Sequence, residues 1–199
     1  METNKTPLSD RWEHLTAVHE AAHAVTAHAL GVRIYSIELT TNTDMDRIRG
    51  RMRYEHTDPM NEAIMSLAGG MGSALAEGRE CPFMFRNAVL PEVIAYRLKI
   101  KCNDSAPVEF LPELTAEAHV SPGDVSDACM CVELLAKGIT DEYERNCAMD
   151  GYFMRAQIDA LFYTSTRKKE ILALADLPCQ RGGKLTKPEI EIFFKAVQQ

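Results

Sequence analysis

The chain has 199 residues, of which 46% are hydrophobic and 26% are charged, a balance typical of a globular domain and not of a disordered segment. Its formal charge of −7 argues against a general affinity for nucleic acid. The sequence has no apolar run long enough to cross a membrane, no leader-like amino terminus and no Cys-x-x-Cys pair. We therefore expect one cytoplasmic domain over residues 1–199, with reduced cysteines and no membrane partner.

The first predicted helix covers residues 12–30, a stretch that is rich in alanine and contains neither proline nor glycine. Gly31 is expected to end it. The helix contains the motif His-Glu-Ala-Ala-His, in which His19 and His23 are four residues apart and lie on one face, where both imidazoles can hold one metal ion. Glu20 follows His19 directly, and its carboxylate can reach a water beside that ion. The motif therefore predicts a hydrolytic metal site.

A β-hairpin is expected after this helix. Residues 34–39 alternate between apolar and polar side chains as a half-buried strand does, and residues 50–55 are their expected partner. The polar stretch 40–46 would form the turn. The second half of the hairpin has a basic cluster that could meet an acidic partner, although such clusters are more often a solvated face: Arg47, Arg49, Arg51 and Arg53.

The rest of the chain is predicted to be mostly helical. A helix over residues 60–78 has many small residues, which would let a neighbouring helix approach closely. Prolines interrupt the stretch 81–112, where only a short helix over residues 92–100 is expected. Ser121 is a suitable cap for a helix over residues 122–137. Further helices are expected over 142–163, 166–177 and 187–197, so the predicted fold class is mainly α with a small β-hairpin (α+β).

A hydrolytic zinc site usually has three protein ligands, so the two histidines need a partner. His14 and His28 are each five residues from a motif histidine and are turned away from the metal face, so neither is expected to be a ligand. Glu62 on the second helix would complete a site of two histidines and one glutamate. Glu77, near the end of that helix, is another candidate, more as an acceptor that orients one of the histidines.

Two aspartates provide the remaining option. Asp124 and Asp127 lie at the start of the helix over residues 122–137, whose first turn could present a short carboxylate to an ion held by the first helix. Helix capping alone also explains an aspartate at either position. From the residues alone, the third ligand stays open among Glu62, Asp124 and Asp127, with Glu77 favoured more for orienting a histidine.

Several segments match the motifs of one protease family. Residues 19–24 (His-Glu-Ala-Ala-His-Ala) resemble the motif His-Glu-Ala-Gly-His-Ala of the zinc protease domain in the FtsH family of AAA+ proteases. Residues 67–70 (Leu-Ala-Gly-Gly) and 75–77 (Leu-Ala-Glu) resemble its second helix. Residues 123–128 (Gly-Asp-Val-Ser-Asp-Ala) resemble its Asn-Asp-Ile-x-x-Ala segment, and residues 155–197 resemble its terminal helices. The resemblance implies an FtsH-peptidase-like helical metalloprotease domain, with a catalytic core over 1–138 and a helical part over 139–199.

The resemblance makes Asp124 the third zinc ligand, beside His19 and His23, and Glu20 the catalytic base. A register shifted by three residues would give the ligand role to Asp127, so this alternative stays open. The implied function is that of a zinc-dependent metalloendopeptidase, which hydrolyses peptide bonds of unfolded or specific protein substrates.

The family's ATPase module and Gly-rich nucleotide loop are absent from this sequence. Hydrolysis by this chain is therefore expected to be independent of ATP, and an unfoldase partner or a homo-oligomer is compatible with the resemblance. By analogy, the strand over residues 50–55 would pair with an extended protein or peptide substrate beside the metal. The alternative function is a non-catalytic binding or regulatory module. The presence of Glu20 argues against it, because such a module has no chemical need for this carboxylate.

Overall fold

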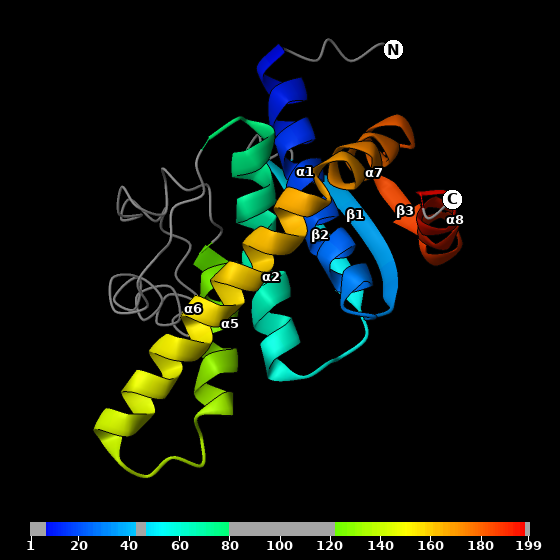
Figure 1. The fold of residues 1–199 in the computed structure, drawn as a ribbon. Helices are drawn as coiled ribbons and strands as arrows, with labels where there is room; N and C mark the ends of the chain where they lie inside the picture. The colour runs from blue at the N-terminus through cyan, green and yellow to red at the C-terminus, as the bar shows by residue number, and fades with distance from the viewer. Residues whose placement is uncertain (1–6, 43–46, 80–121, 198–199) are drawn as a thin grey trace.

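The structure, a computed structural model, describes residues 7–42, 47–79 and 122–197. The predicted turn at 40–46 is wrong for residues 40–42, which extend the first strand, and its remaining residues 43–46 lie outside the described residues. The short helix at 92–100 and the capping Ser121 also lie outside them. The fold class is mainly α with a small sheet, as predicted (Figure 1). The described elements are, in chain order, α1 (Pro7–Ala29), β1 (Ile34–Asn42), β2 (Arg47–Tyr54), α2 (Pro59–Ala76), α5 (Pro122–Leu135), α6 (Glu142–Thr166), α7 (Lys168–Gln180), β3 (Lys184–Thr186) and α8 (Lys187–Val197).

The helix ends follow local signals in the sequence. Gly31 has a φ of 74° and ends α1, as expected, although the helix begins at Pro7 and not at residue 12. α6 and α8 begin at their predicted first residues, and α7 begins at Lys168, close to its predicted start. Within the described parts of the chain, no helix combines the length and the apolar composition that a membrane crossing requires.

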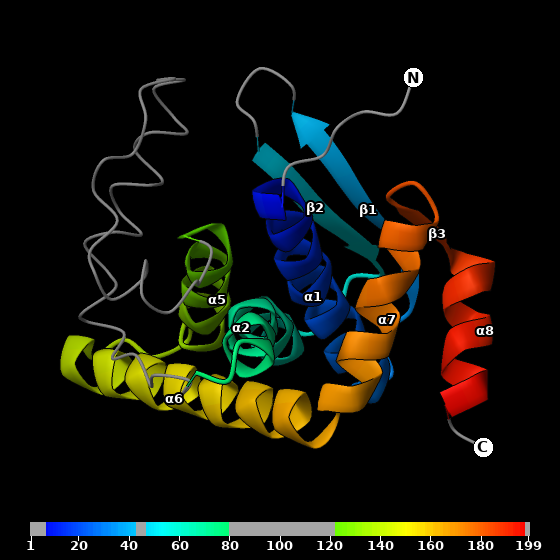
Figure 2. The ribbon, with the colours of Figure 1, turned by 90° about the horizontal axis from the view of Figure 1, so that it is seen from above.

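Two helices form the centre of the fold. α1 packs against α2, α7 and the sheet, and α2 also packs against α5 and α6. Figure 2 shows α2 end-on between α1, α5 and α6, with the sheet, α7 and α8 on the other side of α1. Gly72 of α2 lies so close to Ala22 of α1 that a side chain on Gly72 would clash with the alanine methyl group. The small residues of α2 therefore permit the close helix approach that the sequence predicts.

Buried apolar side chains form two clusters, one on each side of the contact between α1 and α2. The first joins α2 to α5 and α6 and includes Leu67 and Phe153. The second joins α1 to the sheet, α7 and α8 and includes Ile37 and Leu174. Because both central helices are packed on two sides, residues at their mutual contact are held in fixed positions.

The sheet has the strand order β2-β1-β3, and both pairs are antiparallel. Ile37 of β1 lies opposite Met52 of β2 and Leu185 of β3, and both Ile37 and Leu185 are fully buried. A bulge between Ile34 and Ser36 puts Ile34 and Ile37 on the same buried face, which strict alternation would not allow. The sequence does not predict β3, because three residues are too few to show alternation. Among the described strands, β2 forms one edge of the sheet.

Candidate metal centre

Two helices bring three candidate metal ligands together. His19 and His23 come from one face of α1, and Asp124 comes from the first turn of α5. Asp124 Oδ2 lies 2.9 Å from His19 Nε2 and 3.6 Å from His23 Nε2. One donor atom from each of the three residues lies within 4.8 Å of the others. Two imidazole nitrogens and one carboxylate oxygen form a donor set that suits a divalent transition metal and that leaves coordination positions open, as hydrolytic zinc sites do.

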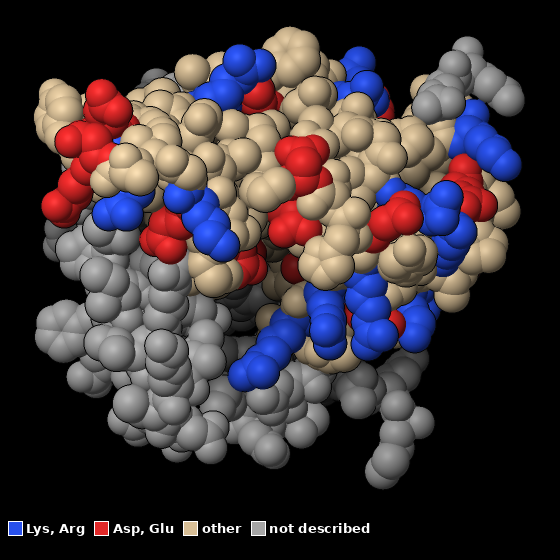
Figure 3. All heavy atoms as spheres, turned by 90° about the horizontal axis from the view of Figure 1, so that it is seen from below, with Lys and Arg blue, Asp and Glu red and all other residues tan. Residues whose placement is uncertain are grey.

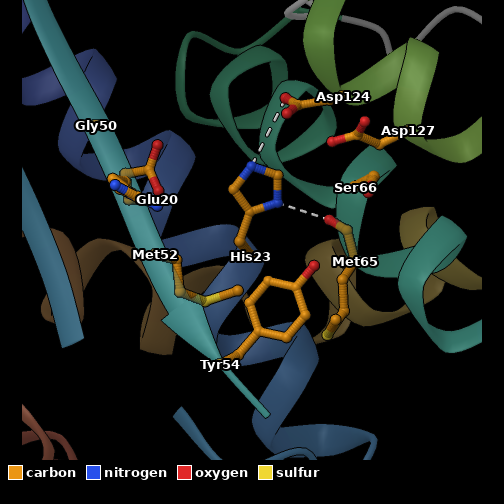
Figure 4. A pocket seen from close by; sticks show the side chains of 10 residues that line it. Glu20, His23, Gly50, Met52, Tyr54, Met65, Ser66, Asp124 and Asp127 are labelled. Atoms are coloured by element: carbon orange, nitrogen blue, oxygen red, sulfur yellow. Dashed lines mark hydrogen bonds and ion pairs between the residues drawn. The ribbon is translucent and has the colours of Figure 1, made fainter. Parts of the chain in front are cut away.

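The two imidazole rings are held by their surroundings. Their centroids are 4.6 Å apart and their planes are nearly perpendicular, at 85°. His23 Nδ1 lies 2.6 Å from the carbonyl oxygen of Met65 in α2 (Figure 4). Because a carbonyl oxygen only accepts hydrogen bonds, Nδ1 must donate to it, which leaves Nε2 as the nitrogen that can bind an ion.

Gly69 of α2 makes room for both rings. A β-carbon on this residue would lie 2.5 Å from His23 Nε2 and 2.6 Å from His19 Nε2, well inside van der Waals contact. Reasoning from the sequence includes Gly69 only among the small packing residues of its helix and misses this role. No local signal identifies it, because the rings that it faces belong to another helix.

The buried carboxylate oxygen of Asp124 faces both histidines. Asp124 Oδ2 is buried and lies against His19 Nε2 and His23 Nε2. A cation bound between the three side chains would take this oxygen and the two nitrogens as its ligands, so the residues present fit a divalent ion.

The other candidate carboxylates do not join the cluster. Asp127, one turn further along α5, lines the same cleft but is not among the three converging donors. Glu62 Oε1 lies 3.0 Å from His56 Nδ1, and Glu62 is outside the cluster as well. Glu77 makes an ion pair with Arg79, and its role as an acceptor for a histidine stays a prediction.

Charges within the cluster are strongly coupled. Burial alone would lower the pKa of His23, but the adjacent Asp124 carboxylate raises this pKa to about 9. Burial would raise the pKa of Asp124, but the two histidines outweigh it and hold this pKa well below its ordinary range. The Asp124 carboxylate is therefore ionised at neutral pH and able to bind a cation.

Glu20 lies beside the cluster, close to β2. Its side chain is almost fully buried, and a β-carbon on Gly50 of β2 would clash with its carboxylate (Figure 4). Gly50 therefore makes the space that Glu20 occupies, a role that sequence reasoning also misses. Burial raises the pKa of Glu20, an effect that His23 and His19 partly offset. A carboxylate with a raised pKa is suited to accept a proton and then return it.

A cleft of about 260 Å³ opens beside the cluster. β2 forms one wall, and α2 and α5 form the other, with Glu20, His23 and Asp124 all lining the cleft (Figure 4). Tyr54 of β2 is half-buried in the first wall. Burial, together with the nearby Glu62 carboxylate, raises the pKa of the Tyr54 hydroxyl to about 12. This hydroxyl is therefore a hydrogen-bond donor throughout the physiological pH range.

We expect the affinity for zinc to fall by up to about tenfold for each pH unit below the pKa of His23. Below a pH of about 9, His23 holds a proton in the ion-free protein, and zinc binds only the neutral imidazole, so binding must release that proton. The affinity should therefore rise with pH. Competition with a chromophoric chelator at several pH values between about 6.5 and 8.5, corrected for the chelator's own protonation, would measure it. An affinity that does not change over this range would contradict the expectation.

Compared with known protein families and with curated proteins, the chain matches none. Its function must therefore be inferred from the site itself. The converging donors, the buried Glu20 and the adjoining cleft are the features from which that inference can be made.

Proposed function

We propose that the chain is a zinc-dependent metalloendopeptidase of the FtsH-peptidase-like type. The observation that supports this most is the convergence of His19, His23 and Asp124 within 4.8 Å, from two helices that are far apart in the sequence. Glu20 lies at the same cleft, as a base for hydrolysis requires. The resemblance of residues 19–24 and 123–128 to the FtsH peptidase motifs agrees with this assignment of roles.

The three ligands and the base would divide the chemistry between them. Zinc held by His19, His23 and Asp124 would polarise the scissile carbonyl and make a water molecule more acidic. Glu20 accepts the proton from the attacking water and transfers it to the amine nitrogen that leaves when the peptide bond breaks. The raised pKa of Glu20 helps the second transfer, because the carboxyl then keeps the proton until the leaving amine takes it. Tyr54 offers its hydroxyl to the substrate within the cleft.

The edge strand β2 would bind the substrate. β2 has β1 on one side and the cleft on the other, so an extended peptide could add to the sheet along β2 and lie next to Glu20 and the histidines. An edge strand is otherwise a liability that proteins tend to cover. We expect no ATP requirement, since the sequence contains no Gly-rich nucleotide loop.

Metal content and chelator-sensitive proteolysis would test this function together. We expect about one zinc per chain for the parent and for Asp127→Ala, and loss of zinc from Asp124→Ala, because only Asp124 belongs to the donor cluster. The zinc-loaded parent should degrade casein, and a zinc chelator should stop the degradation. A chain that binds zinc but cleaves neither casein nor a panel of unfolded proteins would favour the non-catalytic binding module. Retention of about one zinc per chain by Asp124→Ala would show that Asp124 is not a ligand.

A further inference from the structure

A row of arginines lies along the strand that borders the cleft. Arg49, Arg51 and Arg53 are alternate residues of β2, and all three side chains are exposed. The residues between them face the other side of the sheet: Gly50 lies against Glu20, and Met52 is opposite the buried Ile37. Because side chains alternate along a strand, the three arginines share the outer face of the sheet.

Neighbouring carboxylates compensate this positive charge only in part. Glu38 of β1 lies opposite Arg51, and Lys184 of β3, 3.0 Å from its carboxylate, lowers its pKa more than the nearby Arg53 does. Thr40, which has no charge, lies opposite Arg49. None of the three arginines makes an ion pair within the part of the chain that the structure describes. Figure 3 shows Lys and Arg side chains gathered over the β-hairpin, with Asp and Glu side chains across from them over α2 and α5.

The arginine row adjoins the candidate active site directly. Arg51 lines the cleft together with Glu20 and His23. A peptide that adds to β2 as a new strand has the same alternation as β2 itself, so every second side chain lies on the outer face beside the arginines. The intervening side chains point toward the cleft, whose opposite wall contains Asp127.

We propose that Arg49, Arg51 and Arg53 select substrates with Asp or Glu at every second position of an extended segment next to the cleaved bond. This inference rests on the proposed peptidase function. Cross-strand pairs of opposite charge stabilise an added strand, whereas acidic side chains at the intervening positions would face Asp127 and are disfavoured. An acidic peptide fits the row better than a nucleic acid does, because the chain as a whole has a charge of −7.

Binding of labelled peptides would test the alternation itself. The probes are three fluorescein-labelled peptides of equal length: one with Glu at every second position, an isomer with the same Glu residues in one block, and a version of the first with Lys for Glu. Fluorescence anisotropy with the zinc-loaded Glu20→Gln variant measures affinity without cleavage, and the parent gives cleavage rates. We expect the alternating Glu peptide to bind about tenfold more tightly than its isomer, and the Lys peptide to bind most weakly.

Charge reversal would identify the residues responsible. Arg51→Glu should weaken binding of the alternating Glu peptide by about tenfold and improve binding of the Lys peptide. The matched control is Arg145→Glu, the same charge change at an exposed position of α6, which should leave both affinities unchanged. Raising the salt concentration from about 0.05 to 0.5 M should reduce the difference between the peptides.

Several outcomes would overturn the inference: equal binding of the two Glu isomers, an equal effect of the Arg51 and Arg145 variants, or tighter binding of a single-stranded oligonucleotide than of the alternating Glu peptide. These outcomes are separate from the fate of the peptidase function. If the alternating Glu peptide binds selectively through Arg51 but no peptide is cleaved, the arginine row is supported and the hydrolytic role is rejected. If a neutral peptide is cleaved and the selective binding is absent, the peptidase function is supported and the role of the arginine row is rejected.

Discussion

Replacement of Glu20 by glutamine should lower the rate of peptide hydrolysis by about 10²–10⁴-fold, the range typical of a lost general base, while zinc binding stays close to that of the parent. Glutamine has nearly the size of glutamate and fits the same space under Gly50, but it cannot accept the proton of the attacking water. The carboxylate of Glu20 is not one of the three converging donors, so the metal should remain. Initial rates of casein degradation and zinc per chain would be measured on the same samples.

A matched control separates the loss of the base from a general effect of removing a negative charge. Glu191→Gln makes the same chemical change at an exposed position of α8 and should leave the rate unchanged. Hydrolysis by zinc-loaded Glu20→Gln at the parental rate would show that Glu20 is not the base. Loss of both zinc and activity would instead assign Glu20 a role in holding the metal.

Replacement of Gly69 by alanine should weaken zinc binding by about 10- to 100-fold, as changes to residues that orient metal ligands commonly do. The added β-carbon would lie 2.5 Å from His23 Nε2 and 2.6 Å from His19 Nε2, so both rings would have to leave the positions in which they meet Asp124. Overpacking of this kind also costs about 1–3 kcal/mol of stability. Chelator competition would measure the affinity, and thermal unfolding of the metal-free protein would show whether the variant is folded.

Gly151→Ala provides the control for Gly69→Ala. Gly151 lies inside α6, and nothing lies within 4 Å of where its β-carbon would be. Alanine in a helix interior should therefore stabilise the protein by about 0.5–1 kcal/mol and leave zinc affinity unchanged. If Gly69→Ala is folded and binds zinc as tightly as the parent, the packing of α2 against the histidines does not shape the site.

Local patterns in the sequence predict many of the helix ends and two of the candidate metal ligands. The spacing of His19 and His23 places both rings on one face of α1, because the helix repeats every 3.6 residues. Gly31 ends α1 through its positive φ, and the last helices begin close to their predicted residues. The basic cluster on the hairpin is visible in the sequence as well. Each of these features depends on residues that are close together along the chain.

Contacts between distant segments decide the rest. Three carboxylates remain candidates for the third ligand in the sequence, and only the packing of α5 against α2 brings Asp124, and not Asp127 or Glu62, to the histidines. Gly50 and Gly69 have no local signal, because the side chains that they accommodate belong to α1. The short β3 strand and the position of the arginines beside the cleft are likewise set by the assembled sheet. Such features depend on which surfaces meet when the chain folds. The spacing of residues along one helix or strand carries no information about these contacts.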